Sequence, residues 1–308
     1  MRRRNFYRDI LLHCYQRTAD GGVLFYSYSD HLVYFTTYCM LARKYSIHVL
    51  ELCQMPDHVH DAVSAQRPQD LEGFKRDVNS QFARSYNNYW QISGPVFEHP
   101  YGSAVKRGAK NGRTLIVYIG NNPVERQLVT QAEEYRWNYL AYACSDHPFS
   151  EKIVIRNASI PLRKAVKEVK AQFKAGVPMN YALLKRLFCS LDQKECQQLT
   201  DLIISTYNVI DYTEASRYFN SYEEMLVSMH ANTGSEYDLN EVFVGKSDVC
   251  YGEMSVSLRN SGRVGDIHEI LRMTLEQKRD TFQFLRQNSY AMGEQIAKFL
   301  HLPVKIIK

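Results

Sequence analysis

A hairpin-like pattern around Met55 constrains the fold of this chain more than any other feature. Residues 47–52 and 58–64 both have the composition of strands, and Met55-Pro56-Asp57 breaks the pattern between them. Two strand patterns separated by such a short, proline-bearing break predict an antiparallel hairpin. The flanking sequence predicts one more strand and two helices, at residues 10–15, 29–44 and 68–89.

The segment that follows is predicted to be extended and then helical. Residues 94–105 have an extended pattern, and residues 106–112 are expected to form a basic loop that contains glycine. Such a loop is a candidate phosphate contact and is equally compatible with a solvated turn. A helix is expected to begin at Thr114 and to end before Pro123, because a proline disfavours the α conformation at the residue that precedes it.

A domain boundary is expected near residue 150. The alternation of strands and helices ends in the sequence from Trp137 to Lys152, and helical periodicity dominates afterwards. We therefore expect one unit at residues 1–150 and a mainly α-helical unit at residues 151–308. Helices are predicted in the second unit at residues 162–174, 181–188, 196–207, 222–230 and 267–288.

The last twenty residues, 289–308, have the form of a truncated helix-turn-helix. Met292 to Phe299 would be its first helix and residues 301–303 its turn, but only residues 304–308 remain for the recognition helix. A final amphipathic helix without a DNA-reading role explains the same pattern. The sequence leaves these two interpretations open.

Composition indicates an ordinary globular protein. With 308 residues, of which 45% are hydrophobic and 23% charged, the chain is long enough for two domains. No apolar run reaches the roughly 20 residues of a membrane span, and the start of the chain does not resemble a signal peptide, so we expect a cytoplasmic protein without a membrane partner. The seven scattered cysteines include no C-x-x-C pair, which argues against a disulfide framework and a zinc ribbon.

The net charge of +5 is only weakly informative. Residues 1–143 contain 17 Lys and Arg against 13 Asp and Glu, and the remainder contains 21 against 20. Divided in this way, the chain has its positive excess in the N-terminal part. The excess is compatible with contacts to phosphate groups but does not require them.

Two histidines in the second strand of the hairpin are candidate metal ligands. His58 and His60 are separated by one residue, and side chains two apart on a strand project from the same face. Both imidazoles can therefore reach one divalent ion while Val59 points to the opposite face. An isolated pair of this kind is also compatible with histidines that bind nothing.

A tyrosine and an asparagine on the later helix form a second candidate pair. Tyr118 and Asn122 are four residues apart, so their side chains share one helical face. The phenol would be the nucleophile and the carboxamide oxygen a neutral metal ligand. A helical tyrosine more often serves packing, and this chain contains 22 tyrosines.

The two pairs together fit one reaction. A phenol, with a usual pKa of about 10, is a poor nucleophile at neutral pH, but it can attack a phosphodiester that a divalent cation polarises. The resulting phosphotyrosine keeps the energy of the broken linkage, so a later hydroxyl can reseal the strand. No nucleotide cofactor is needed, and neither a G-x-x-x-x-G-K-[ST] nor a G-x-G-x-x-G motif is present.

The chain resembles the REP-associated tyrosine transposases, relatives of the small insertion-sequence transposases that use one tyrosine and an HUH motif. The resemblance spans residues 8 to about 143 and is carried, in the same order and spacing as in the family, by four stretches: ARKYSIHVLELCQMPDHVHDAV, FARSYNNYWQISGPVFEHPYGSAV, IVYIGNNPVERQLV and EEYRWNYLAY. The first matches the HUH strand of the family and the third its catalytic helix.

The resemblance implies a ferredoxin-like (RRM-like) α+β domain whose antiparallel sheet has helices on one side. It implies that His58, His60 and Asn122 hold Mg²⁺ or Mn²⁺, that Tyr118 is the nucleophile, and that single-stranded or hairpin DNA is cut and rejoined. Candidate DNA contacts, through charge and base stacking, are Arg84, Tyr86, Tyr89, Trp90, Lys106 and Arg107.

Two acidic residues depart from the family pattern. Asp57 stands where the family has Asn, and Asp61-Ala62 replaces two aliphatic residues after the second histidine. Each carboxylate has three open possibilities: it joins the metal shell, it favours the charged form of the histidines, or it faces solvent.

These departures keep alternatives to a transposase-like enzyme open. One alternative is a non-catalytic, host-retained DNA-binding protein derived from such a transposase. Another is a metal-dependent hydrolase of small phosphate esters, which would have no use for Tyr118. The DNA site and the oligomeric state, including a homodimer, stay open as well.

Overall fold

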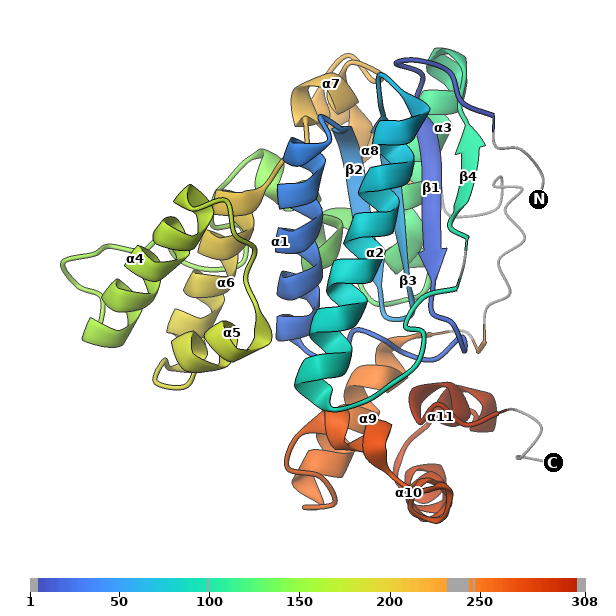
Figure 1. Cartoon of the computed structure of the whole chain (residues 1–308), viewed down its shortest axis with the longest axis vertical. Helices are drawn as coiled ribbons and strands as arrows, with labels where there is room; N and C mark the ends of the chain where they lie inside the picture. Colours follow the sequence, from blue (N-terminus) through green and yellow to red (C-terminus); the bar gives the residue numbers. More distant parts are fainter. Residues whose placement is uncertain (1–4, 99, 232–243, 246, 304–308) are drawn as a thin grey trace.

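A four-stranded antiparallel sheet of order β2-β3-β1-β4 lies at the centre of the computed structural model, which describes residues 5–98, 100–231, 244–245 and 247–303 (Figure 1). Helix α1 (Tyr28–Lys44) connects the first two strands and α2 (Pro68–Trp90) the last two. This β-α-β-β-α-β order is ferredoxin-like, so the expected α+β class is confirmed. The strands are β1 (Leu12–Arg17), β2 (His48–Met55), β3 (His58–Ser64) and β4 (Gly102–Val105).

The two faces of the sheet pack against different helices. On β3, Val59 and Val63 join a core with α1 and α2. Ala62, whose side chain has the opposite parity, joins a second core with α3 (Gly108–Glu125) and α8 (Tyr222–Ala231). Helices α1 and α2 therefore lie together on one face, as Figure 1 shows, and α3 covers the other.

Helix α3 is longer than the sequence predicts at both ends. It begins at Gly108, inside the expected basic loop, so that loop is reduced to a short link after β4. It also continues through Pro123 to Glu125. Pro123 cannot donate an N–H to the preceding turn, and only two helical residues follow it before α3 ends.

Residues 126–231 wrap around the sheet domain. After three short 3₁₀ turns, η1 (Ala132–Glu134), η2 (Arg136–Asn138) and η3 (Leu140–Ala143), the chain forms a helical projection that packs against α1. It then returns through α7 (Tyr212–Ser216) to α8, which packs against α3. The helices of the projection are α4 (Ile160–Lys174), α5 (Tyr181–Phe188) and α6 (Gln193–Tyr207).

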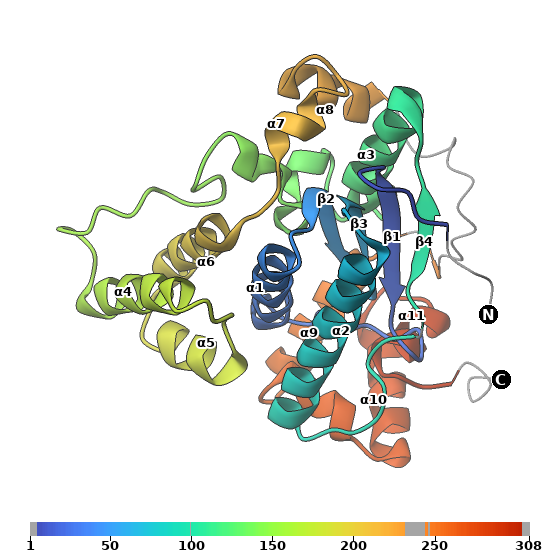
Figure 2. The same ribbon diagram turned by 45° about the horizontal axis from the view of Figure 1, so that its top comes forward.

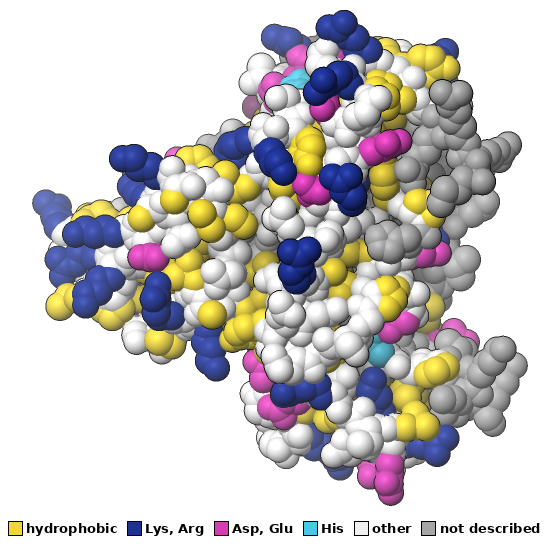
Figure 3. Space-filling model, in the orientation of Figure 1, with side chains coloured by type: hydrophobic (Ala, Val, Ile, Leu, Met, Phe, Trp, Pro, Cys, Tyr) yellow, Lys and Arg dark blue, Asp and Glu magenta, His cyan; other side chains and the backbone are white. Residues whose placement is uncertain are grey.

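The described C-terminal residues form a third group of helices below the sheet (Figures 1 and 2). This group has a hydrophobic core of its own. It consists of α9 (Val249–Asn260), η4 (Ile267–Arg272), α10 (Leu275–Asn288) and α11 (Gly293–Phe299). The space-filling view shows the projection and the C-terminal group as two separate protrusions from the central body (Figure 3).

The expected helical character of the second half is confirmed, although its helices attach to the sheet domain at several places. The boundary near residue 150 stays a prediction, since α4, α5 and α6 share one hydrophobic core with α1 and α2. The first helix of the predicted helix-turn-helix corresponds to α11, and its recognition segment, residues 304–308, lies outside the described residues. None of the described helices combines the length and the hydrophobicity of a membrane span.

Candidate active site

His58 and His60 project from the central strand β3 toward α3. Both side chains are buried, with exposed fractions of 8% and 0%, and their ring centroids lie 4.8 Å apart at an interplanar angle of 81°. Val59, between them, packs into the opposite core with α1 and α2. This is the arrangement that a strand with side-chain period two imposes on H-x-H.

Helix α3 brings Tyr118 next to these histidines. The centroid of its ring lies 5.4 Å from that of His60, in an edge-on arrangement, and the tyrosine is only 3% exposed. Asn122, one turn further along α3, is fully buried. Neither the nitrogen nor the oxygen of its carboxamide has a hydrogen-bond partner among the described residues. A buried amide without partners is costly, so a ligand at this position would stabilise it.

His13 of β1 is a member of the cluster that the sequence analysis did not identify. Its Nε2 lies 2.9 Å from Nδ1 of His60, and its ring centroid lies 5.6 Å from that of Tyr118. Strand β1 pairs with β3 so that Tyr15 is opposite His60, which places His13 diagonally beside it on the same face. The sequence does place His13 in a predicted strand, which could have marked it as a candidate. Its contact with His60 depends on the register between the strands, which the sequence does not specify.

Asp57 contacts the other histidine. Its Oδ1 lies 2.7 Å from Nδ1 of His58, and its Oδ2 pairs with Nζ of Lys298, on α11, at 2.5 Å. Burial would raise the pKa of Asp57, but the contacts with His58 and Lys298 together hold this pKa well below its usual range. Of the three possibilities for Asp57, solvent exposure is therefore wrong, since the carboxylate orients the ring of His58.

Asp61 lies on the opposite face of the sheet from the histidines. Its carboxylate is 1% exposed, accepts a hydrogen bond from the hydroxyl of Tyr38 at 2.7 Å, and forms an ion pair with Lys75. It faces neither solvent nor the histidine cluster. Asp61 belongs to the packing between the sheet and the α1–α2 layer.

The donor set fits a divalent metal in its chemistry. Nδ1 of each histidine contacts a neighbouring side chain, Asp57 or His13, so Nε2 is the nitrogen that each ring presents on its other edge. No group of three or more His, Cys, Asp or Glu arranged to hold a metal occurs within the described ranges. The assignment of the Asn122 carboxamide oxygen as a third ligand stays a prediction.

Glu51 is a second buried group that the sequence analysis missed. It lies on β2, is 1% exposed, and neither carboxylate oxygen has a hydrogen-bond partner in the described structure. A side chain at Gly120 of α3 would begin 3.1 Å from Oε1 of Glu51, so the carboxyl group packs directly against that helix. Burial raises the pKa of Glu51 well above its usual value, which favours the neutral acid.

The six candidate DNA contacts separate into two sets. Arg84 and Arg107 are exposed and Lys106 is half-buried, so these three are accessible at the surface. The guanidinium of Arg107 lies 3.7 Å from the ring centroid of Tyr7.

The three aromatic candidates differ in burial and contact other side chains of the protein. Tyr86 is 2% exposed, Tyr89 stacks on Tyr181 of α5 at 4.9 Å, and Trp90 stacks on His268 of η4 at 3.6 Å. Base stacking does not fit the burial of Tyr86, whereas Tyr89 and Trp90 are half-buried and line a cavity, so their role as base contacts stays a prediction.

A cavity of about 420 Å³ leads to the cluster beside His58. It lies between the sheet domain and the C-terminal group, and its wall includes Arg17, Asp57, Arg126 and Lys298. His60, Tyr118 and Asn122 do not line this cavity and are almost inaccessible.

No family model and no curated protein matches the chain. Among solved structures, a REP-associated tyrosine transposase bound to a REP hairpin is similar to it, with a TM-score of 0.41 and 14% sequence identity. The likeness covers 47% of this chain and 86% of the transposase chain. Roles for the clustered residues rest on the contacts described above.

Proposed function

We propose that this protein is a metal-dependent DNA strand transferase that nicks and rejoins single-stranded or hairpin DNA through a covalent phosphotyrosine on Tyr118. The observation that supports it most is the position of the Tyr118 ring, 5.4 Å from that of His60. Tyr118 and His60 lie nearly sixty positions apart on two different elements, yet their rings meet in one buried cluster.

The proposed reaction is an in-line displacement at phosphorus. Oη of Tyr118 gives up its proton and forms a bond to the scissile phosphorus. The bond from phosphorus to the 3′ oxygen breaks, and that oxygen takes up a proton and leaves as a hydroxyl. The DNA 5′ end is then held as a phosphotyrosine. Rejoining reverses the step when a 3′ hydroxyl attacks and the phenol regains its proton, so no nucleotide is consumed.

His58, His60 and Asn122 would hold a divalent ion, Mg²⁺ or Mn²⁺, in this proposal. Bound there, the ion would polarise the phosphodiester and stabilise charge that develops on its oxygens. Asp57 and His13 would keep the two imidazoles in orientation. Single-stranded DNA would approach from the cavity beside His58, with exposed Arg84 and Arg107 as backbone contacts.

A covalent-adduct assay tests the proposal. Labelled hairpin oligonucleotides with single-stranded flanks, incubated with the protein and Mn²⁺, should give a slower band on denaturing electrophoresis. Tyr118→Phe should abolish this band, while Tyr135→Phe, which removes a hydroxyl bonded to the backbone of β2, should keep it. An adduct that survives in Tyr118→Phe would contradict the assigned nucleophile.

The second candidate is a DNA-binding protein that does not cleave. The observation that favours it is the burial of Tyr118, which leaves 3% of the residue accessible and requires an opening before DNA can reach it. Mn²⁺ binding and DNA binding without any adduct, in wild type and Tyr118→Phe alike, would support this candidate.

A further inference from the structure

The positive charge of this chain is concentrated in one short segment. Residues 152–190, hereafter the basic lobe, contain nine Lys and Arg and a single Glu. The whole chain has 38 Lys and Arg against 33 Asp and Glu, so the residues outside the basic lobe are net negative by three charges. A division of the chain near residue 143 conceals this feature, because the acidic residues after 190 offset the lobe.

The charges of the basic lobe all lie on its surface. Every one of its nine basic side chains is exposed, and Figure 3 shows Lys and Arg gathered over the helices that project from α1. Of the nine, only Arg186 forms a salt bridge in the described structure, with Glu168 at 3.5 Å. The other eight cations of the lobe form no salt bridge with the acidic side chains of the described residues.

Helix α4 arranges four of these cations in a line. Arg163, Lys167, Lys170 and Lys174 follow each other at spacings of four, three and four residues, which puts them on one helical face. From first to last they span eleven residues, or about 16 Å at 1.5 Å per residue. A duplex rises 3.4 Å per base pair, so the line matches the backbone of about five base pairs.

We propose that the basic lobe binds the phosphate backbone of duplex DNA, and specifically the stem of a hairpin substrate. That the partner is DNA rests on the proposed function. That the partner is anionic and extended rests only on the charge pattern of the lobe. Recognition is independent of base sequence, since exposed Lys and Arg on one helical face contact phosphates and do not enter a groove.

An anionic membrane surface is a weaker match for the same charges. A helix that binds at a lipid interface inserts its apolar face into the bilayer. The apolar face of α4, with Leu162, Val166 and Val169, is buried against the protein core and is not available for insertion. The exposed face of the helix offers a line of cations, which suits a linear polyanion.

The placement of the lobe suits a substrate with two parts. Helices α5 and α6 pack against α1, on the face of the sheet opposite to α3, and the lobe projects sideways from there (Figures 1 and 2). The lobe and the histidine cluster are thus separate surfaces. A hairpin would hold its stem on the lobe while its single-stranded flank reaches the cluster.

A duplex-binding assay tests this inference. Fluorescence anisotropy measures the binding of a labelled 20-base-pair duplex between 50 and 200 mM salt, and EDTA removes divalent metal so that no cleavage occurs. The test variant is Arg163→Gln/Lys167→Gln/Lys170→Gln/Lys174→Gln. The matched control removes four exposed charges elsewhere, as Arg76→Gln/Arg217→Gln/Arg279→Gln/Arg286→Gln. Circular dichroism melting confirms that both variants are folded.

The lobe variant should bind the duplex at least about 10-fold more weakly at 50 mM salt. The slope of log affinity against log salt should also become shallower by about 2 to 4 units, because each lost phosphate contact reduces the slope by about 0.9. The control should keep most of the wild-type slope. Equal slopes in both variants, or wild type that binds anionic vesicles but not the duplex, would overturn the inference.

The adduct assay separates this inference from the proposed function. A Tyr118 adduct together with an unaffected lobe variant would overturn the inference and leave the proposed function standing. A lobe-dependent affinity for duplex DNA without any adduct would support the inference and remove the proposed function.

Discussion

At the residue scale, two side chains of the candidate site contact the histidines and not the proposed metal. His13 contacts Nδ1 of His60 and Asp57 contacts Nδ1 of His58, so each imidazole is fixed at one nitrogen. Such contacts select the tautomer and the ring orientation of a ligand histidine. The metal affinity of the proposed site should therefore depend on His13 nearly as much as on the proposed ligands.

His13→Phe removes the nitrogen that contacts His60 and keeps an aromatic ring of similar shape. We expect Mn²⁺ to bind roughly 10- to 100-fold more weakly, because the ring of His60 is no longer held in place. Isothermal titration calorimetry measures the change. The control is His48→Asn, which removes an exposed histidine of β2 paired with Asp211. Equal affinities in wild type and His13→Phe would rule out this positioning role.

Spacing along the chain predicted which residues of the cluster share a face, but it did not identify every member. A two-residue period puts His58 and His60 on one face, and a four-residue period puts Tyr118 and Asn122 on one face. The same two-residue period, applied one position further, already assigns Asp61 to the face of Val59, where the structure has it. The sequence analysis did not identify His13, because its position beside His60 depends on the register between β1 and β3.

At the scale of single elements, local sequence located most helices and strands but not their ends. Helix α3 continues for only two residues beyond Pro123, so the proline marks the region where the helix ends but not its last residue. For helix α11, the sequence predicted the helix itself but not the part of the protein against which it packs. Lys298 on α11 reaches Asp57 of the β2–β3 turn, a contact between residues 241 positions apart.

The pair of Lys298 with Asp57 should be a main anchor of α11. Both side chains are mostly buried, 15% and 16% exposed, so Lys298→Met leaves a carboxylate that has lost its cation. We expect the free energy of local opening of α11 to fall by about 2 kcal/mol. Hydrogen exchange of residues 293–299 measures this quantity.

Asp57→Asn provides the matched control for this prediction. A neutral side chain at position 57 does not need the cation of Lys298, so Lys298→Met should cost less in an Asp57→Asn background. A coupling free energy of about 1 kcal/mol or more is expected from the double-mutant cycle. Additive effects of the two substitutions would show that the ion pair does not anchor α11.

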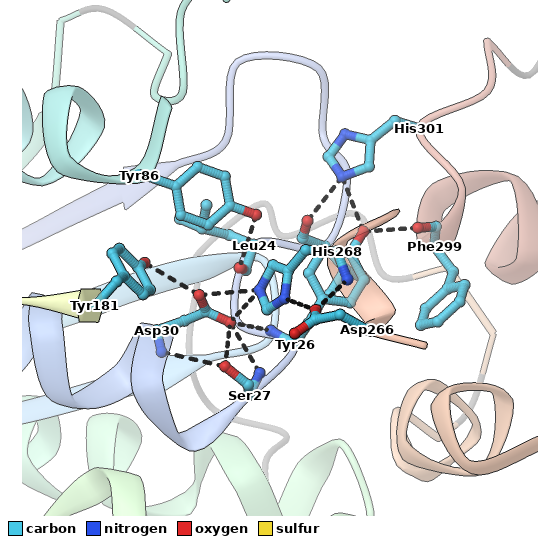
Figure 4. Close-up of polar contacts among 11 residues, drawn as sticks. Leu24, Tyr26, Ser27, Asp30, Tyr86, Tyr181, Asp266, His268, Phe299 and His301 are labelled. Carbon is cyan, nitrogen blue, oxygen red and sulfur yellow. Dashed lines mark hydrogen bonds and ion pairs between the residues drawn. The ribbon is translucent and has the colours of Figure 1, made fainter. Parts of the chain in front are cut away.

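At the scale of the whole molecule, one carboxylate joins three parts of the chain. Asp30 caps the N-terminus of α1 by accepting from the backbone N–H of Ser27 at 2.8 Å, and it also accepts a hydrogen bond from Tyr181 of α5 at 3.0 Å. His268 of η4 contacts the same carboxylate at 2.9 Å (Figure 4). The capping role follows from the sequence Ser27-x-x-Asp30, whereas contacts across 151 and 238 positions arise only in the folded chain.

The charge of His268 is the titratable part of this junction. Burial alone would lower the pKa of His268, but Asp30 and Asp266 raise it to about 9. Tyr26 and Tyr86 also face its ring, and burial raises their pKa values well above 10, so they stay neutral. His268 is therefore a cation at neutral pH, held between two carboxylates.

Stability should consequently fall at alkaline pH in a manner that depends on His268. Because its pKa is about 9 in the folded chain and about 6.5 when unfolded, its contribution is complete below pH 6.5 and is lost as the pH rises through 9. The shift corresponds to about 3 kcal/mol at most. His268→Gln should lower the melting temperature measured by scanning calorimetry at pH 6.5, and the gap to wild type should narrow by pH 10. A gap of constant size across this range would mean that packing against Trp90, and not the charge of His268, joins the C-terminal helices to the sheet domain.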